Sequence, residues 1–167
     1  CAAVPDSMLE ALLFGYERGA FTGAHNPNKG IFRAADGGTL LLDEVSEMAP
    51  HLQAKFLRVL QEKEVTPLGG SKPVPVDVRV IATSNRYMMD EVKAGRFRED
   101  LYYRLAEIVV RIPSLAGRAG DAGLLARHFA TKYAAAMNPN VKGLAPDALA
   151  AVDRWTWPGN VRELENV

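Results

Sequence analysis

GGTLLLDEV, residues 37–45, is the stretch on which the expected fold of this chain depends. Two glycines lead into a short apolar run, and two carboxylates, Asp43 and Glu44, close it. Short apolar runs bounded by turn-forming residues are typical of buried strands. We therefore predict a buried strand that carries acidic side chains at its carboxyl end.

Two further runs extend the pattern along the chain. VDVRVIATSN, residues 76–85, is rich in β-branched residues and ends in a small polar tip, and EIVVRIP, residues 107–113, is a third apolar run. Between the first two runs, residues 48–64 place apolar side chains at helical spacing behind Pro50, which suits a first helical turn. Strands that alternate with helices predict an α/β fold with a parallel sheet covered by helices. Ligands of such sheets bind at the carboxyl ends of the strands.

The composition changes after residue 120. Helical stretches follow, two of them rich in alanine, at residues 122–137, at residues 145–155 and beyond Pro158. We therefore predict two parts, a partial α/β subdomain over residues 1–120 and a small helical subdomain over residues 121–167.

Charge and composition exclude several classes of protein. The 20 basic and 20 acidic residues balance, which argues against a general nucleic-acid or membrane-surface binder. The single cysteine, Cys1, excludes an internal disulfide framework and fits a reducing compartment. No apolar run approaches the roughly 20 residues of a membrane span, so we expect a cytoplasmic protein without membrane contact. The chain starts without Met and stops within a helical pattern, so we expect a piece of something longer.

Acidic and amide side chains follow the first two predicted strands. An acidic pair that ends an apolar strand has the form of a Walker B motif. The carboxylate of Asp43 can hold a hydrated Mg²⁺, and Glu44 can orient or deprotonate an attacking water. The alternative is that the pair only begins a loop. Asn85 could position the water against a γ-phosphate, or it could cap its own turn.

Arginines are the third kind of candidate. GRFREDLYYRL, residues 95–105, carries Arg98 and Arg104 beside acidic neighbours. Such arginines usually form solvated pairs, but they can also reach a transferring phosphate in a neighbouring subunit, as an arginine finger does. Arg162 lies in WPGNVRELENV, residues 157–167. It is either an ordinary surface residue of a capped helix or a sensor of nucleotide.

Together these stretches resemble one family closely. GAFTGA, residues 19–24, precedes the strand that ends in Asp43 and Glu44, and GRFREDLYYRL and WPGNVRELENV follow in the family's order. The chain thereby resembles the AAA+ domain of sigma-54-dependent transcription activators, or bacterial enhancer-binding proteins, through nearly its whole length. The implied fold is a P-loop-type parallel sheet flanked by helices, followed by an all-α lid.

The resemblance implies an ATP-driven machine, usually a hexameric ring, that remodels the closed complex of sigma-54 RNA polymerase holoenzyme. Its cofactors would be ATP and Mg²⁺, and enhancer DNA would be read mainly through a domain outside this chain. Residues 64–77 match the family's second surface loop, which is thought to move with GAFTGA. The implied nucleotide-site residues are Asp43 for Mg²⁺, Glu44 for activation of water, Ser84 and Asn85 in the sensor I region, Arg98 and Arg104 as fingers, and Arg162 as sensor II. The implied sigma-54 contacts are Gly19, Ala20, Phe21, Thr22, Gly23 and Ala24.

One part of the family's machinery is missing from these 167 residues. No Gly-Lys-Ser or Gly-Lys-Thr sequence occurs in the chain, so it holds no Walker A phosphate loop, which we expect upstream of Cys1. A second reading is therefore open, in which this piece is a non-hydrolysing binding and assembly module. A third reading, another AAA+ remodeller, conflicts with GAFTGA.

Overall fold

The computed structural model describes residues 6–137, 141 and 143–167, so Cys1 lies outside the described residues. The chain divides into two compact units, Cys1–Val109 and Val110–Val167. Within the described part, no helix combines the length and the apolar character that crossing a bilayer requires.

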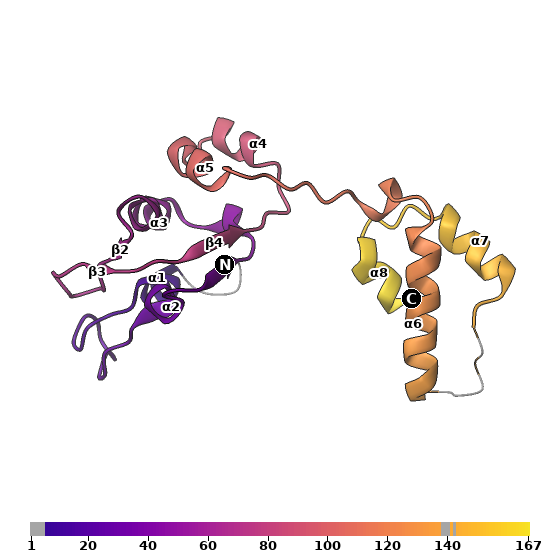
Figure 1. The fold of residues 1–167 in the computed structure, drawn as a ribbon, viewed down its shortest axis with the longest axis horizontal. Helices are drawn as coiled ribbons and strands as arrows, with labels where there is room; N and C mark the ends of the chain where they lie inside the picture. The colour runs from indigo at the N-terminus through magenta and orange to yellow at the C-terminus, as the bar shows by residue number, and fades with distance from the viewer. Residues whose placement is uncertain (1–5, 138–140, 142) are drawn as a thin grey trace. The chain divides into compact units, whose positions relative to one another are not determined.

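The first unit is a mixed α/β structure and the second is helical (Figure 1). The elements of the first unit are α1 (Asp6–Phe14), α2 (Gly30–Ala34), β1 (Thr39–Leu42), the 3-10 turn η1 (Val45–Glu47), α3 (Pro50–Glu62), β2 (Glu64–Val65), β3 (Val74–Pro75), β4 (Arg79–Ala82), α4 (Met88–Lys93) and α5 (Glu99–Leu105). Those of the second are η2 (Leu115–Gly117), α6 (Asp121–Met137), α7 (Pro146–Arg154) and α8 (Asn160–Asn166).

Strands β1 and β4 pair in parallel, which confirms the predicted α/β fold with a parallel sheet. Leu40 faces Val80 and Leu42 faces Ala82 across the pair, and these side chains point into the core. The alternate pair faces away, with Leu41 60% and Ile81 46% exposed. Helices therefore cover one face of this pair within the described residues.

Three aromatic rings join the helices around the strands. Phe14 of α1 stacks on Phe32 of α2 with ring centroids 5.8 Å apart, and Phe32 meets Phe56 of α3 at 5.7 Å. Phe32 and Phe56 are fully buried. Such side chains bury large apolar areas, so this stack is a main source of the unit's stability.

The predicted third strand is wrong in this structure. Residues 107–113 form no strand, and Ile108, Val109, Val110 and Ile112 are all exposed. A strand needs a neighbour to satisfy its backbone groups, and the described sheets contain only the pairs β1–β4 and β2–β3. The apolar pattern is present, but the described chain offers it no pairing partner.

The second unit has its own small core. Trp157 and Leu164 pack with Leu115 and alanines of α6, and the Trp157 indole donates to the carbonyl of Val152 at 2.8 Å. The amide of Leu115 donates to Oδ1 of Asn160 at 2.8 Å, which ties η2 to the start of α8. This region is helical, as its alanine-rich composition predicts.

Two glycines close the base of the segment that carries GAFTGA. Gly15 and Gly30 have φ values of +78° and +75°. A Cβ added at Gly15 would lie 2.4 Å from the carbonyl oxygen of Asn28, and one at Gly30 would lie 2.3 Å from the nitrogen of Gly15. The two backbones therefore approach so closely that no side chain fits between them.

We predict that Gly15→Ala destabilises the chain much more than Gly95→Ala. Gly95 has a similar φ, +70°, but a Cβ there would meet nothing within 4 Å, which makes it the matched control. Gly95→Ala should cost about 1–2 kcal/mol from its left-handed backbone. Gly15→Ala should cost about 1–3 kcal/mol more from the clash. Urea unfolding of both variants measures the difference, and equal losses would contradict the close approach.

Candidate functional site

The carboxyl ends of β1 and β4 bring polar residues together, among them the predicted Asp43 and Glu44. Asp43 follows β1 and Thr83 follows β4, and the hydroxyl of Thr83 donates to Oδ1 of Asp43 at 2.5 Å. The same hydroxyl accepts the amide of Glu44 at 3.2 Å, and the amide of Val45 donates to the carbonyl of Thr83 at 2.9 Å. The strand pairing thus continues beyond the strands and fixes both loops relative to each other.

Glu44 has an unusual backbone. Its φ of 53° and ψ of 54° are left-handed, a conformation that few residues other than glycine adopt. Such a conformation costs about 1–3 kcal/mol and is concentrated at functional sites. The Nδ2 group of Asn85 donates to Oε1 of Glu44 at 3.4 Å, so this amide touches the carboxylate that we predicted to activate water.

The acidic pair suits a hydrated magnesium ion. Mg²⁺ keeps several waters and takes one or two protein carboxylates together with substrate phosphates. Asp43 and Glu44 are adjacent at an exposed edge of the sheet, which leaves room for those waters. Among the residues with described placement, no group of three or more His, Cys, Asp or Glu side chains forms a complete protein cage. The donor set therefore fits Mg²⁺ that is shared with a phosphate.

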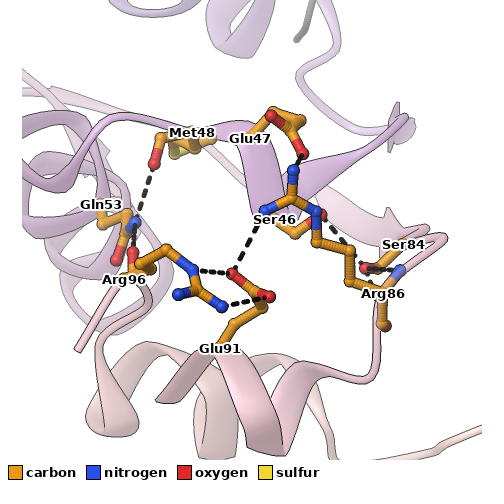
Figure 2. Close-up of polar contacts among 8 residues, drawn as sticks. All are labelled: Ser46, Glu47, Met48, Gln53, Ser84, Arg86, Glu91 and Arg96. Atoms are coloured by element: carbon orange, nitrogen blue, oxygen red, sulfur yellow. Dashed lines mark hydrogen bonds and ion pairs between the residues drawn. The ribbon is translucent and has the colours of Figure 1, made fainter. Parts of the chain in front are cut away.

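The Ser84 side chain contacts η1, whereas that of Asn85 contacts the Glu44 carboxylate. Its hydroxyl lies 3.2 Å from that of Ser46 and accepts the amide of Arg86 at 3.0 Å (Figure 2). The side chain therefore ties the loop after β4 to η1. A nucleotide-binding role for Ser84 stays a prediction.

Arg98 sits at the start of α5 and is held by a carboxylate. Its Nε and one terminal nitrogen donate to the two oxygens of Asp100 at 3.0 and 2.7 Å. This pairing raises the pKa of Arg98 and lowers the pKa of Asp100. Arg98 and Asp100 line a shallow pocket with Glu99 and Tyr103. The guanidinium lies about half exposed there, where an incoming anion could replace Asp100.

Arg104 is anchored on its own unit. Its guanidinium donates to the carbonyl of Leu60, near the end of α3, at 3.0 Å and lies 3.5 Å from the carboxylate of Glu107. It is not grouped with Asp43 and Glu44 by any contact in the described structure. A finger role would require it to leave the Leu60 carbonyl, so this role stays a prediction.

A buried carboxylate that the sequence analysis missed lies behind the site. Glu91 of α4 is only 5% exposed and accepts two hydrogen bonds from Arg96, at 2.6 and 2.9 Å. Arg86 also approaches Glu91 at 3.3 Å and pairs with Glu47 of η1 at 2.6 Å (Figure 2). The hydrogen bonds from Arg96, aided by the charges of both arginines, hold the pKa of Glu91 at about 2, below its ordinary 4.5.

Gln53 is a second residue that the sequence analysis missed. It is fully buried in α3, and Nε2 donates to the carbonyls of Met48 at 2.7 Å and Arg96 at 3.0 Å. Its Oε1 accepts the amide of Arg98 at 2.8 Å. The signal was an amide on the apolar face of α3, beside Phe56 and Leu57.

The GAFTGA segment forms a compact turn. Tyr16 and Asn28 exchange backbone hydrogen bonds of 2.9 and 2.8 Å at its base, and Ala24 is buried. Phe21 is 45% exposed at the tip, where its ring meets that of Tyr16 edge-on with centroids 4.9 Å apart. Thr22 is exposed beside it. The turn thus presents an aromatic side chain to solvent on an ordered base.

The second surface loop touches this turn. Strands β2 and β3 pair at the base of the loop, and the amide of Glu17 donates to the carbonyl of Leu68 at 2.9 Å. A Cβ at Gly69 would lie 2.9 Å from the Cβ of Ala20. In Figure 1, both loops lie at the end of the first unit opposite to the direction in which β4 points. Contact between them gives a physical route for the two loops to move together.

Arg162 belongs to the other unit. It is exposed on α8, where Glu163 accepts the amide of Gly159 at 2.7 Å and the indole of Trp155 at 2.9 Å. These bonds hold the start of α8, one turn from Arg162. A sensor role for Arg162 stays a prediction.

Comparisons with known proteins agree across the chain. Residues 1–111 match the sigma-54 interaction domain, and residues 116–167 match the AAA+ ATPase lid domain. The chain is 52% identical to the DNA-binding transcriptional activator HyfR of Escherichia coli K12, with 100% of this chain and 25% of that protein covered. It is 54% identical to the response regulator protein FleR of Pseudomonas aeruginosa, with 99% and 35% covered.

A solved structure of a similar protein has the same fold over nearly the whole chain. NtrX from Brucella abortus superposes with a TM-score of 0.88 at 36% identity, over 99% of this chain and 37% of that one. NtrX has also been solved in complex with ATP. The chain therefore spans about a quarter to two fifths of the length of these similar proteins.

The buried carboxylate leads to a prediction about pH. Because the pKa of Glu91 is about 2 in the folded chain and ordinarily 4.5, its ionised form stabilises the fold above that ordinary value. This stability is lost as the pH falls from about 5 towards 2. Glu91→Gln should therefore be least stable relative to wild type near neutral pH, and the difference should shrink in acid. Urea unfolding at several pH values measures it.

The complementary variant is Arg96→Gln, which removes the hydrogen bonds that lower the pKa of Glu91 most. It should flatten the same part of the pH profile. A Glu91→Gln variant whose deficit stays constant between about pH 5 and pH 2 would contradict the linkage.

Proposed function

The chain belongs to the sigma-54 interaction domain family, with a AAA+ ATPase lid, and we propose that it works in an ATP-dependent activator of sigma-54 RNA polymerase. The activator couples ATP hydrolysis in an oligomeric ring to remodelling of the closed promoter complex. Its place of action is the cytoplasm. Enhancer DNA is read mainly by a domain outside these residues.

The cluster at the carboxyl ends of β1 and β4 carries this proposal. Asp43, held by the hydroxyl of Thr83, binds Mg²⁺ together with the phosphates of ATP. Glu44 takes a proton from the attacking water, and Asn85, which lies 3.4 Å from the Glu44 carboxylate, orients that water. Ser84 contacts the hydroxyl of Ser46 and so connects the loop that carries Asn85 to η1, which follows Glu44.

The arginines give the reason for assembly. In the proposed ring of six, Arg98 and Arg104 act on ATP held by the neighbouring subunit, so one subunit alone cannot complete its site. Arg98 is the better placed, because its exposed guanidinium can exchange Asp100 for a phosphate in a similar two-pronged geometry. Arg162 senses the nucleotide from the lid.

Residues Gly19 to Ala24 form the proposed contact with sigma-54. Phe21 offers an exposed ring on a short turn, and such rings supply much of the binding energy at protein interfaces. The contact between Ala20 and Gly69 would let the second loop report the nucleotide state to this turn.

Two substitutions in the full-length protein test the proposal. Glu44→Gln should keep ATP binding but lower kcat for hydrolysis by about 100-fold or more, because the general base is lost.

Phe21→Ala should leave hydrolysis within about twofold and lower open-complex formation by at least about tenfold, because the loop loses its aromatic contact with sigma-54.

The control for Phe21→Ala is Leu124→Ala, which removes another exposed apolar side chain, from α6. It should leave both activities unchanged. Normal hydrolysis in Glu44→Gln would remove Glu44 from its role, and retained promoter opening in Phe21→Ala would remove the loop from its role.

A second candidate function rests on the missing Walker A sequence. Without phosphate-binding amides and a lysine, these 167 residues by themselves form a binding and assembly module that presents GAFTGA. We expect the purified 167-residue chain to show little ATP hydrolysis in a steady-state phosphate-release assay. Robust turnover by this chain would refute the module reading.

A further inference from the structure

We propose that Gln53, supported by Glu91, is a positioning residue for the finger arginine Arg98. This inference rests on the proposed function, since it needs Arg98 to act on nucleotide. It goes beyond that function by naming the side chains that set the position of the finger, and by linking that position to the subunit's own acidic pair.

The side-chain amide of Gln53 makes the first connection to Arg98. It uses both of its polar atoms on backbone groups of two separate loops, Met48 after η1 and residues 96–98 before α5. Gln53 is fully buried, so no water can replace these partners. A buried amide with three satisfied bonds fixes geometry, because moving either loop leaves polar groups unpaired.

Glu91 makes the second connection. Its carboxylate accepts two hydrogen bonds from the Arg96 side chain, and its backbone carbonyl accepts the amides of Arg96 and Phe97 at 3.0 and 3.2 Å. Phe97 itself is buried in the core. The three residues before α5 are thus fixed one by one: Arg96 by Glu91, Phe97 by packing, and Arg98 by Gln53.

Both connections also reach the loops that follow β1 and β4, where the candidate site lies. Met48 follows η1, which begins directly after Glu44, and its carbonyl is held by Gln53. Arg86 follows Asn85 directly and joins Glu47 to Glu91 (Figure 2). A shift of either loop when nucleotide binds or is hydrolysed would therefore move the backbone at Arg98. The site of one subunit is in this way connected to the finger that serves the next.

Loss of this support should act on turnover more than on ATP affinity. Misplacing a catalytic group by about 1 Å can cost about 100-fold in rate. Gln53→Met in the full-length protein should therefore lower kcat for ATP hydrolysis at least about tenfold, with KM changed less than about threefold. The matched control is Gln61→Met, an exposed glutamine of the same helix, which should keep normal turnover.

Mixed rings separate positioning of the finger from a defect in the variant's own site. Glu44→Gln subunits have a dead site but an intact finger, so they should restore turnover to neighbouring Gln53→Met subunits. In a random equal mixture, half of the sites are Gln53→Met sites and half of these face a Glu44→Gln finger. About a quarter of wild-type activity should therefore return. A merely structural role of Gln53 would show no such recovery.

Arg98→Ala mixed with Glu44→Gln is the reference, and it should recover in the same way. If this reference recovers and the Gln53→Met mixture does not, the inference is overturned while the proposed function stands. If neither recovers, the role of Arg98 between subunits fails, and this inference fails with it. Should Gln53→Met not bind ATP, Glu91→Gln in the same mixture decides by the same criteria.

Discussion

The parallel pairing of β1 with β4 is the constraint on which the first unit depends. Two strands that are far apart in sequence must align in one register, with Thr39 opposite Arg79 and Leu42 opposite Ala82, so that Asp43 and Thr83 meet beyond their carboxyl ends. The connection between the two strands contains α3, β2 and β3, and the buried ring of Phe56 in α3 packs in one core with residues of the strands, α1 and α2. Without this pairing the acids would sit on an isolated loop.

The interior of the unit is not purely apolar, and this matters for the proposed positioning of Arg98. Gln53 and Glu91 are buried polar residues that an apolar core would not need for stability alone, because satisfied buried polar groups roughly offset their cost of desolvation. Their hydrogen bonds fix the positions of particular segments relative to one another. They join segments before α5, after η1 and after β4, whereas apolar contacts would allow these segments to slide.

The two surface loops are held together by backbone contacts instead of buried polar side chains. Backbone hydrogen bonds at Leu68 hold the second loop against the first, and Ala20 of the first loop lies against Gly69 of the second. Gly15 and Gly30 lie at the two ends of the GAFTGA segment and let these ends approach where any side chain would collide. Phe21 is thus exposed on a turn whose base is held by backbone hydrogen bonds.

Sequence alone determined most of the elements and predicted the residues of the candidate site. Local patterns predicted β1, α3, β4 and the helical second unit. Local motifs predicted Asp43, Glu44 and Asn85 after the ends of strands. Both kinds of prediction succeed because hydrophobic periodicity and the residues that follow a strand can be read from neighbouring positions. Pairing is not local. The run at residues 107–113 has the pattern of a strand but lies in no sheet, since only a partner could satisfy its backbone. Gln53 and Glu91 likewise look ordinary in sequence, and only the tertiary structure, which buries them against distant backbone and arginines, decided what they hold.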